Sequence, residues 1–288
     1  MDAVIWEARP QLNRPVMVAA FEGWNDAADA ASGAVTWLRR RLKATQIARI
    51  DPEEFYDFQS TRPEVSLIEG TTRKVSWPAN DCFAAHVEEV GRDLVLFSGV
   101  EPNLKWRTFC NTVIGVARET GCEMVVTLGA LLADVPHTRP TRLTGTAVDP
   151  ELIARLGLSH SRYEGPTGIV GVLHDFCRQA GMPSVSLWAP VPHYVASPPN
   201  PKATQALLER LSEVLAIPMG MGDLAEAAVG WEARVNELVG SDPDIAAYVR
   251  QLEERDDDQI DEDSLPSGDT LAAELERYLR DQRPRDSG

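Results

Sequence analysis

Short, continuous runs of apolar residues recur through the first two hundred positions of the chain. Three of them, at residues 15–21, 93–99 and 123–129, are too short to be helices. Continuous apolar runs of this length are typical of strands that are buried on both faces of a sheet. A helical pattern at 106–120 connects the second run to the third, which predicts a βαβ unit in a mainly parallel or mixed sheet.

The first apolar run leads into a turn and a helix. Residues 22–24 turn the chain, and Asn25 or Asp26 can cap a helix predicted at 27–42, which ends in three arginines. The same patterns predict further strands at 45–51, 65–68, 73–77 and 184–189, and further helices at 150–156 and 168–180.

After residue 201 the pattern becomes helical, with apolar residues at helical spacing in 202–216, 224–238 and 244–252. An acidic run at 253–263 then precedes a short amphipathic stretch at 270–280. We therefore predict an α/β body over residues 1–200 and a helical C-terminal section over 201–252, packed on the body. Residues 253–288 are expected to form a flexible acidic linker and a short terminal helix.

Charge is distributed unevenly along this acidic chain. The formal net charge is -16, and the last 38 residues hold 13 acids and 5 arginines, so they contribute -8, which is half of the total. A surface this acidic repels phosphate backbones and anionic membranes. Nucleic acids and membranes are therefore not expected as partners.

The cysteine pattern and the terminal sequence place the chain among cytoplasmic proteins. Cys82, Cys110, Cys122 and Cys177 stand far apart with no ligand spacing, so neither a metal nor a disulfide framework is expected. The first residues lack the features of a signal peptide, and no apolar stretch approaches the ~20 residues that cross a bilayer. We expect a reduced, cytoplasmic protein.

Polar and aromatic residues gather where the predicted strands end, although no motif for phosphate cradling or for a serine nucleophile is present and no cofactor is expected. Loops of this kind meet along one edge of a parallel sheet, where they form either a ligand cleft or a protein interface. The candidate ligand or interface residues are Glu22, Trp24, Asn25, Asp26, Arg62, Glu101, Asn103, Lys105, Trp106, Asp134, His137, Arg139 and Thr167.

Two of these loops offer more specific chemistry. Asp134, His137 and Arg139 together could bind a carboxylate or phosphate or transfer protons, but a structural loop or an oligomer contact explains them equally well. The segment Glu164-Gly-Pro-Thr-Gly168 opens a helix, so it could present backbone N–H groups to an anion or simply form a capped turn.

The strand-end motifs also carry a family resemblance. Residues 21–27 (FEGWNDA), 57–63 (DFQSTRP), 99–107, 128–140 and 163–168 resemble the proteasome assembly chaperone 2 family, and its bacterial branch in particular. The resemblance implies a three-layer α/β/α body similar to nucleoside phosphorylases and related hydrolases, with a helical C-terminal extension. It also implies homo-oligomers, such as trimers, and a role in handling proteasome core subunits, with no defined catalytic residues.

One family feature is not matched. Family members that dock on the proteasome core use a C-terminal motif with a penultimate tyrosine, whereas this sequence ends in Arg-Asp-Ser-Gly288 and its last tyrosine is Tyr278. Docking through the body or the acidic tail is the route that stays open.

Two functions of different classes therefore follow from the sequence. The first is a non-enzymatic assembly or chaperone-type protein that acts through protein–protein contacts. The alternative is a protein or hydrolase that binds a nucleoside, phosphate or carboxylate at the strand-end edge, with Asp26, Asp134, His137 and Arg139 as its polar groups.

Overall fold

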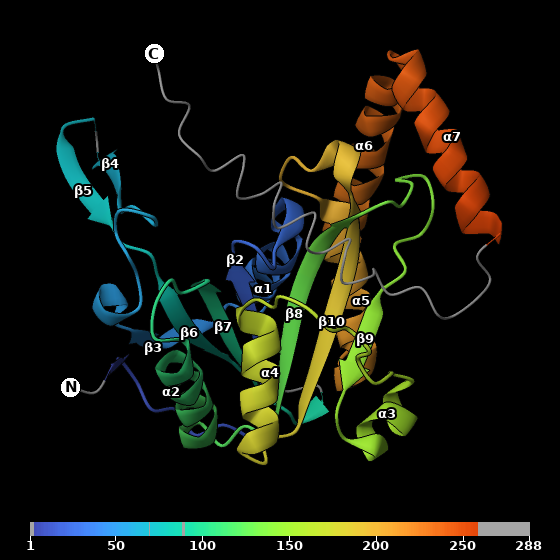
Figure 1. Ribbon diagram of the computed structural model, residues 1–288. Coiled ribbons are helices and arrows are strands. Elements are labelled where there is room, and N and C mark those ends of the chain that lie inside the picture. The colour runs from blue at the N-terminus through green and yellow to red at the C-terminus, as the bar shows by residue number, and fades with distance from the viewer. Residues whose placement is uncertain (1–2, 69, 88–89, 259–288) are drawn as a thin grey trace.

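The computed structural model describes residues 3–68, 70–87 and 90–258, and an eight-stranded mixed sheet lies at its centre (Figure 1). The strand order is β1-β3-β6-β7-β2-β8-β10-β9. The four neighbouring strands β7, β2, β8 and β10 are parallel, and the remaining pairs are antiparallel. The strands are β1 (Val4–Trp6), β2 (Val16–Glu22), β3 (Thr45–Ile50), β6 (Asn80–Ala85), β7 (Leu94–Val100), β8 (Met124–Ala133), β9 (Thr144–Ala147) and β10 (Ser184–Pro192).

Helices cover both faces of this sheet. One hydrophobic core joins the sheet to α1 and α5, and a second core on the opposite face joins it to α2 and α4. The predicted three-layer α/β/α architecture is therefore confirmed. The helices are α1 (Ala30–Arg41), α2 (Trp106–Glu119), α3 (Pro150–Leu156), α4 (Ile169–Gln179), α5 (Pro201–Leu215), α6 (Gly222–Gly240) and α7 (Pro243–Asp258).

Strand β2 shows how a continuous apolar run serves both cores. Successive side chains of a strand point to opposite faces. Val18 and Ala20 accordingly belong to the core beneath α1 and α5, whereas Met17 and Phe21 belong to the core beneath α2 and α4. Because β2 lies inside the sheet and has a helix layer on each side, every position from Val16 to Phe21 must be apolar.

Three strands of the sheet were not predicted from the sequence. β1, β6 and β9 have short or mixed sequences whose strand conformation depends on antiparallel pairing with β3, β7 and β10. Strands β7 and β8 are connected through α2 as predicted, but β2 lies between them in the sheet. The polypeptide therefore crosses over one strand rather than joining neighbours.

The strands predicted at 65–68 and 73–77 form a separate hairpin. β4 (Glu64–Ile68) and β5 (Thr72–Ser76) pair only with each other, and all of their residues are exposed. The hairpin extends from the β3–β6 side of the molecule, away from the large sheet (Figure 1). At its base Trp77 packs edge-on against Phe58, with ring centroids 4.7 Å apart.

The C-terminal helices follow their predicted ranges closely, with one correction. α5 packs on α1 and β10, and α6 packs on α5. α7 continues to Asp258, six residues into the predicted acidic linker. At the start of that extension Leu252 is buried and Glu253 accepts a hydrogen bond from Thr138, so this part of the helix is attached to the body. The helix predicted at 270–280 and the rest of the acidic tail lie outside the described residues. The division into domains stays a prediction.

Candidate functional site

The predicted loops begin at one edge of the sheet, where β2, β7 and β8 end side by side in parallel. Glu22 closes β2, Glu101 follows β7 and Asp134 follows β8. This edge is where open α/β sheets place their functional residues. The structure divides the candidate residues at this edge into two main clusters, one around Glu101 and one around His137.

Glu101 is the centre of the first cluster. Its Oε1 accepts a hydrogen bond from Nδ2 of Asn25 (2.7 Å) and another from the backbone N–H of Ile169 (2.8 Å), and its own backbone N–H donates to the carbonyl of Glu22 (2.9 Å). Burial raises the pKa of Glu101, although these hydrogen bonds favour its ionised form. One carboxylate therefore connects the loop after β2, the loop after β7 and the N-terminus of α4.

Close packing against Gly168 completes this cluster. Asn25 is 1% exposed, and a Cβ added at Gly168 would lie 2.3 Å from its Oδ1. A side chain at position 168 would displace the Asn25 amide and break its bond to Glu101. The glycine at the end of the Glu164–Gly168 segment is thus required by packing. Its neighbour Thr167 is exposed, as is Glu22, and Trp24 is half-buried.

Asp26 caps the first turn of α1 with its side chain, but the helix begins at Ala30 and not at the predicted residue 27, because a 3-10 turn at Ala27–Asp29 comes first and places Asp29 at the N-cap position. Oδ1 of Asp26 accepts hydrogen bonds from the backbone N–H groups of Ala31 (2.7 Å) and Ser32 (3.2 Å). Burial raises the pKa of Asp26 to about 6, against the opposing effect of these hydrogen bonds. Asn25, the other predicted cap, instead donates to Glu101.

Left-handed backbone conformations mark the two turns at this edge. Ala28 and Asp29, in the turn before α1, have φ of 52° and 53°, and Lys105, before α2, has φ of 53°. Non-glycine residues adopt this region at a cost of order 1–3 kcal/mol each. The turns are stabilised by the cap from Asp26 and by an ion pair between Lys105 and Glu54 (3.2 Å).

The remaining candidates near β7 bind the 57–63 loop to the loop after the strand. Oδ1 of Asn103 accepts hydrogen bonds from the backbone N–H of Asp57 (3.1 Å) and from the hydroxyl of Thr61 (2.9 Å). Trp106 donates its indole N–H to the carbonyl of Pro102 (2.6 Å). Arg62 is exposed in the same loop. These contacts hold the base of the β4–β5 hairpin to the body.

His137 is the centre of the second cluster and is only 2% exposed. Its Nε2 lies 3.1 Å from Oδ1 of Asn236 and its Nδ1 lies 2.8 Å from the hydroxyl of Tyr194. Since the Asn236 oxygen can only accept, Nε2 carries the proton and Nδ1 accepts from Tyr194. Burial lowers the pKa of His137, which favours this neutral form. His137 therefore links the loop after β8 to α6 and to the segment after β10.

The other two residues of this loop have different surroundings. Asp134 is exposed, lies 3.1 Å from Nδ1 of His193 and accepts a hydrogen bond from the hydroxyl of Tyr248 (3.3 Å). Arg139 is half-buried. Both ring nitrogens of His137 are engaged within the protein, so in this arrangement the imidazole contributes to cohesion between elements.

Several members of these clusters were not singled out from the sequence. Tyr56 donates to the carbonyl of Val100 (2.6 Å) and receives a hydrogen bond from Asn80, while Tyr194 and Asn236 surround His137. Tyr56 and Asn80 lie beside the predicted strand ends but outside any pattern that marks them. Asn236 is an exposed residue beside the buried stripe of α6, so the sequence pattern does not mark it either.

Comparison with known proteins shows which family has this fold and these two clusters. The family model described as PAC2 family matches residues 20–239, which include both clusters. The chain belongs to the PAC2 family. The resemblance drawn from the strand-end motifs is thus confirmed, and most of those motifs contribute residues to the Glu101 and His137 clusters of this fold.

Solved structures of similar PAC2 chains agree with the assignment. A PAC2 family protein from Streptomyces avermitilis is 51% identical, covering 82% of this chain and 99% of that one, with a TM-score of 0.77. A proteasome-assembly chaperone homologue from Mycobacterium tuberculosis is 47% identical over 81% and 99% of the two chains, with a TM-score of 0.75. A second Mycobacterium tuberculosis protein, of unknown function, is 30% identical over 97% and 96%, with a TM-score of 0.82. No curated protein matches the sequence.

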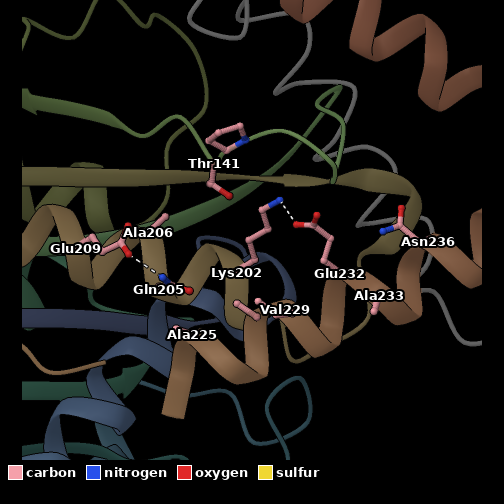
Figure 2. A pocket seen from close by; sticks show the side chains of 12 residues that line it. Thr141, Lys202, Gln205, Ala206, Glu209, Ala225, Val229, Glu232, Ala233 and Asn236 are labelled. Atoms are coloured by element: carbon pink, nitrogen blue, oxygen red, sulfur yellow. Dashed lines mark hydrogen bonds and ion pairs between the residues drawn. The ribbon is translucent and has the colours of Figure 1, made fainter. Parts of the chain in front are cut away.

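A groove opens beside the His137 cluster in this PAC2 chain. It lies between α5, α6 and the loop after β8, and has a volume of about 520 Å³ (Figure 2). Lys202 and Glu232 form an ion pair across it. Alanine and valine side chains supply much of its remaining lining, so the groove combines small apolar side chains with a few charged ones.

The described part of this PAC2 chain has no cluster of metal ligands and no accessible cysteine. Within residues 3–68, 70–87 and 90–258, no cluster of three histidines, cysteines or carboxylates could hold a metal ion. Across the same ranges, none of the helices has the length and apolar character to span a membrane. All four cysteines are free and buried, and burial raises the pKa of Cys110 and Cys177 to about 12, which disfavours the reactive thiolate.

Proposed function

We propose that this protein is a non-enzymatic assembly chaperone of the PAC2 family, which acts in the cytoplasm through protein–protein contacts. The proposal includes self-association into a homo-oligomer and proteasome core subunits as partners. The observation that carries it is the 47% identity, over 81% of this chain, to a protein described as a proteasome-assembly chaperone homologue.

The geometry of the strand-end edge supports a role in protein binding rather than in catalysis. The Glu101 carboxylate, Nδ2 of Asn25 and both ring nitrogens of His137 are hydrogen-bonded to other parts of the same chain, whereas the buried Oδ1 of Asn25 has no partner among the described residues. Such groups order the loops rather than await a substrate. Leu104 is the exposed large apolar residue in the loop after β7, and the other large exposed apolar side chains gather mainly on the β4–β5 hairpin, at the adjoining Trp77 and on α6. Exposed apolar patches with polar surroundings are typical of protein-binding surfaces.

The direct test is co-purification of the full chain with separately produced proteasome α and β subunits. We expect the chain to bind unassembled subunits and to speed the appearance of assembled core particles. An unrelated protein with a similar net negative charge is the control, because an acidic surface can bind basic proteins nonspecifically. Absence of co-purification, together with normal proteasome assembly in a deletion strain, would exclude the proposed partner.

The small-ligand alternative stays a prediction, favoured by one observation. Asp26 and Glu101 are two carboxyl groups with raised pKa values, and they lie in neighbouring loops that the Asn25–Glu101 hydrogen bond joins. These loops are at the edge where α/β folds bind ligands. A thermal-shift screen with nucleosides, nucleotides and sugar phosphates tests it. Ligand at about 100 times Kd should add about 2.7 kcal/mol to the free energy of unfolding, and an unchanged Tm for every ligand would argue against this alternative.

A further inference from the structure

The groove between α5 and α6 has the length of a short helix. One face of each helix lines it, and Pro140 and Thr141, in the loop after β8, add a third wall (Figure 2). On α6 the lining extends from Ala225 to Asn236, which is about 17 Å at 1.5 Å per residue. About three turns of a further helix therefore fit along the groove.

Small apolar side chains prepare this groove for larger ones. Ala206, Ala225 and Ala233 line it, together with Val229, which is 72% exposed. Alanine side chains leave room for the larger apolar side chains of a segment that enters from outside. Neighbouring apolar side chains that are exposed in this way typically mark a binding surface.

The chain itself contains a segment of matching length and character. Residues 270–280 read TLAAELERYLR and place Leu271, Leu275, Tyr278 and Leu279 at helical spacing. In helical form this C-terminal segment is about 16 Å long with one narrow apolar face. Its two glutamates and two arginines balance, so the acidic body does not repel it. Amphipathic helices of this kind bind apolar grooves through side chains at such intervals.

The last described helix, α7, ends beside a wall of the groove. Oδ2 of Asp256, near the end of α7, lies 3.6 Å from Nη2 of Arg142, which adjoins the groove residue Thr141. Residues 259–269 connect α7 to the C-terminal segment and can span up to about 36 Å. A tether of this length gives an effective concentration on the order of millimolar. Contact within one chain is therefore favoured over the same contact from a second molecule at lower concentration.

We propose that the α5–α6 groove binds residues 270–280 of its own chain, as a helix whose apolar face covers Val229 and the alanines around it. The C-terminal segment therefore competes with any external amphipathic helix for this surface. The contact does not depend on the proteasome partner, because both of its surfaces belong to one chain.

Site-specific cross-linking of the full chain tests whether the C-terminal segment occupies the groove. The four native cysteines are buried, so Val229→Cys with Leu275→Cys adds one new thiol to each surface. A short bis-maleimide should join these two thiols within one chain at least about tenfold faster than in the control pair. The control combines Leu275→Cys with Ala227→Cys, because Ala227 is exposed on the same helix but lies outside the groove.

Two results of the cross-linking would overturn the proposal. Equal rates for the two pairs would show that the C-terminal segment does not favour the groove. A product with the mass of two chains would show that the segment of another copy fills it.

Limited proteolysis provides a second test on the full chain. Trypsin cleaves after Arg277 and Arg280, and docking should slow both cleavages because a protease attacks the released segment. Val229→Asp places a charge in the groove and should speed them at least about fivefold, whereas Ala227→Asp should leave the rate unchanged. Both positions are exposed, so neither change should unfold the protein. Equal cleavage rates in wild type and both variants, measured by mass spectrometry, would refute the contact.

Discussion

Asp26, four residues beyond the end of β2, shows how one residue connects the sheet to the start of a helix. Its carboxylate satisfies two backbone N–H groups at the start of α1, and the backbone at this residue also bridges to Ala130 of β8. Glu101 performs the corresponding task at the start of α4. In both cases a buried carboxyl group provides an acceptor that the helix terminus lacks. The same burial makes the charged form costly and gives these groups a pH dependence.

We predict that Asp26→Asn removes a pH-dependent part of the stability. The pKa of Asp26 is about 6 in the folded protein and its ordinary value is 3.8, so the folded state binds this proton more tightly. This contribution is therefore fully present below about pH 4 and is lost as the pH rises through about 6. Asparagine keeps an oxygen for capping but does not titrate, so wild type should lose stability relative to Asp26→Asn across that interval.

Urea denaturation at several pH values between 4 and 8 measures this difference. Relative to Asp26→Asn, Asp26→Ala should cost about 1–2 kcal/mol at every pH, because neither side chain titrates and alanine removes the cap itself. Asp29→Asn is the matched control, since Asp29 is exposed in the same turn and asparagine tolerates its left-handed backbone. Parallel pH profiles of wild type and Asp26→Asn would contradict the prediction.

At the scale of elements, strands of similar local sequence have opposite roles. β3 is part of the large sheet, and its apolar residues contribute to the core beneath α2. β4 follows it in the chain and has apolar residues too, but they lie outside both cores. Packing on a helix layer, rather than strand formation, decides which of the two supports the fold.

We therefore predict very different costs for the same substitution in these two strands. Ile68→Ser changes an exposed side chain on the face of β4 opposite Leu67 and should alter the free energy of unfolding by no more than about 0.5 kcal/mol. Ile47→Ser in β3 removes a fully buried side chain and should cost at least about 3 kcal/mol. Chemical denaturation of both variants measures the contrast, and similar losses would mean that the hairpin belongs to the folding core.

The whole molecule combines a closed α/β/α body with two surfaces that extend from it. The β4–β5 hairpin and the α6–α7 pair lie toward opposite ends of the sheet order, on either side of the strand-end edge (Figure 1). The body is stabilised by two cores, and its polar edge is internally bonded. We therefore expect association with other proteins to involve the extending elements.

The net charge leads to a prediction at this scale. At -16 the full chain should not bind duplex DNA or vesicles rich in anionic lipid, even at about 50 mM salt, where electrostatic attraction is strongest. Fluorescence anisotropy and vesicle co-sedimentation measure this, with a basic protein as positive control. Binding that weakens as salt is added would show that a local basic surface overrides the total charge.

Particular elements show how far the sequence predicts this fold. The apolar runs of β2, β7 and β8 and the helical spacing of α2 and α5 are local patterns, and each marks its own burial. β6 carries no such pattern, because its conformation is imposed by pairing on both sides. The cap from Asp26 was visible because it acts five residues away, whereas the bonds of His137 to Tyr194 and Asn236 span 57 and 99 residues.

The sequence by itself determined the α/β class and the acidic character, since periodic burial and total charge are properties of local order and composition. Its strand-end motifs indicated the family, and the resemblance implied the three-layer architecture. Only the tertiary structure decided that Glu101 and His137 bind together distant loops, and that the β4–β5 hairpin stands apart from the sheet. Those outcomes depend on which surfaces meet when the layers pack. No local pattern along the chain predicts these contacts, because the free energy of each contact depends on two segments that are far apart in the sequence.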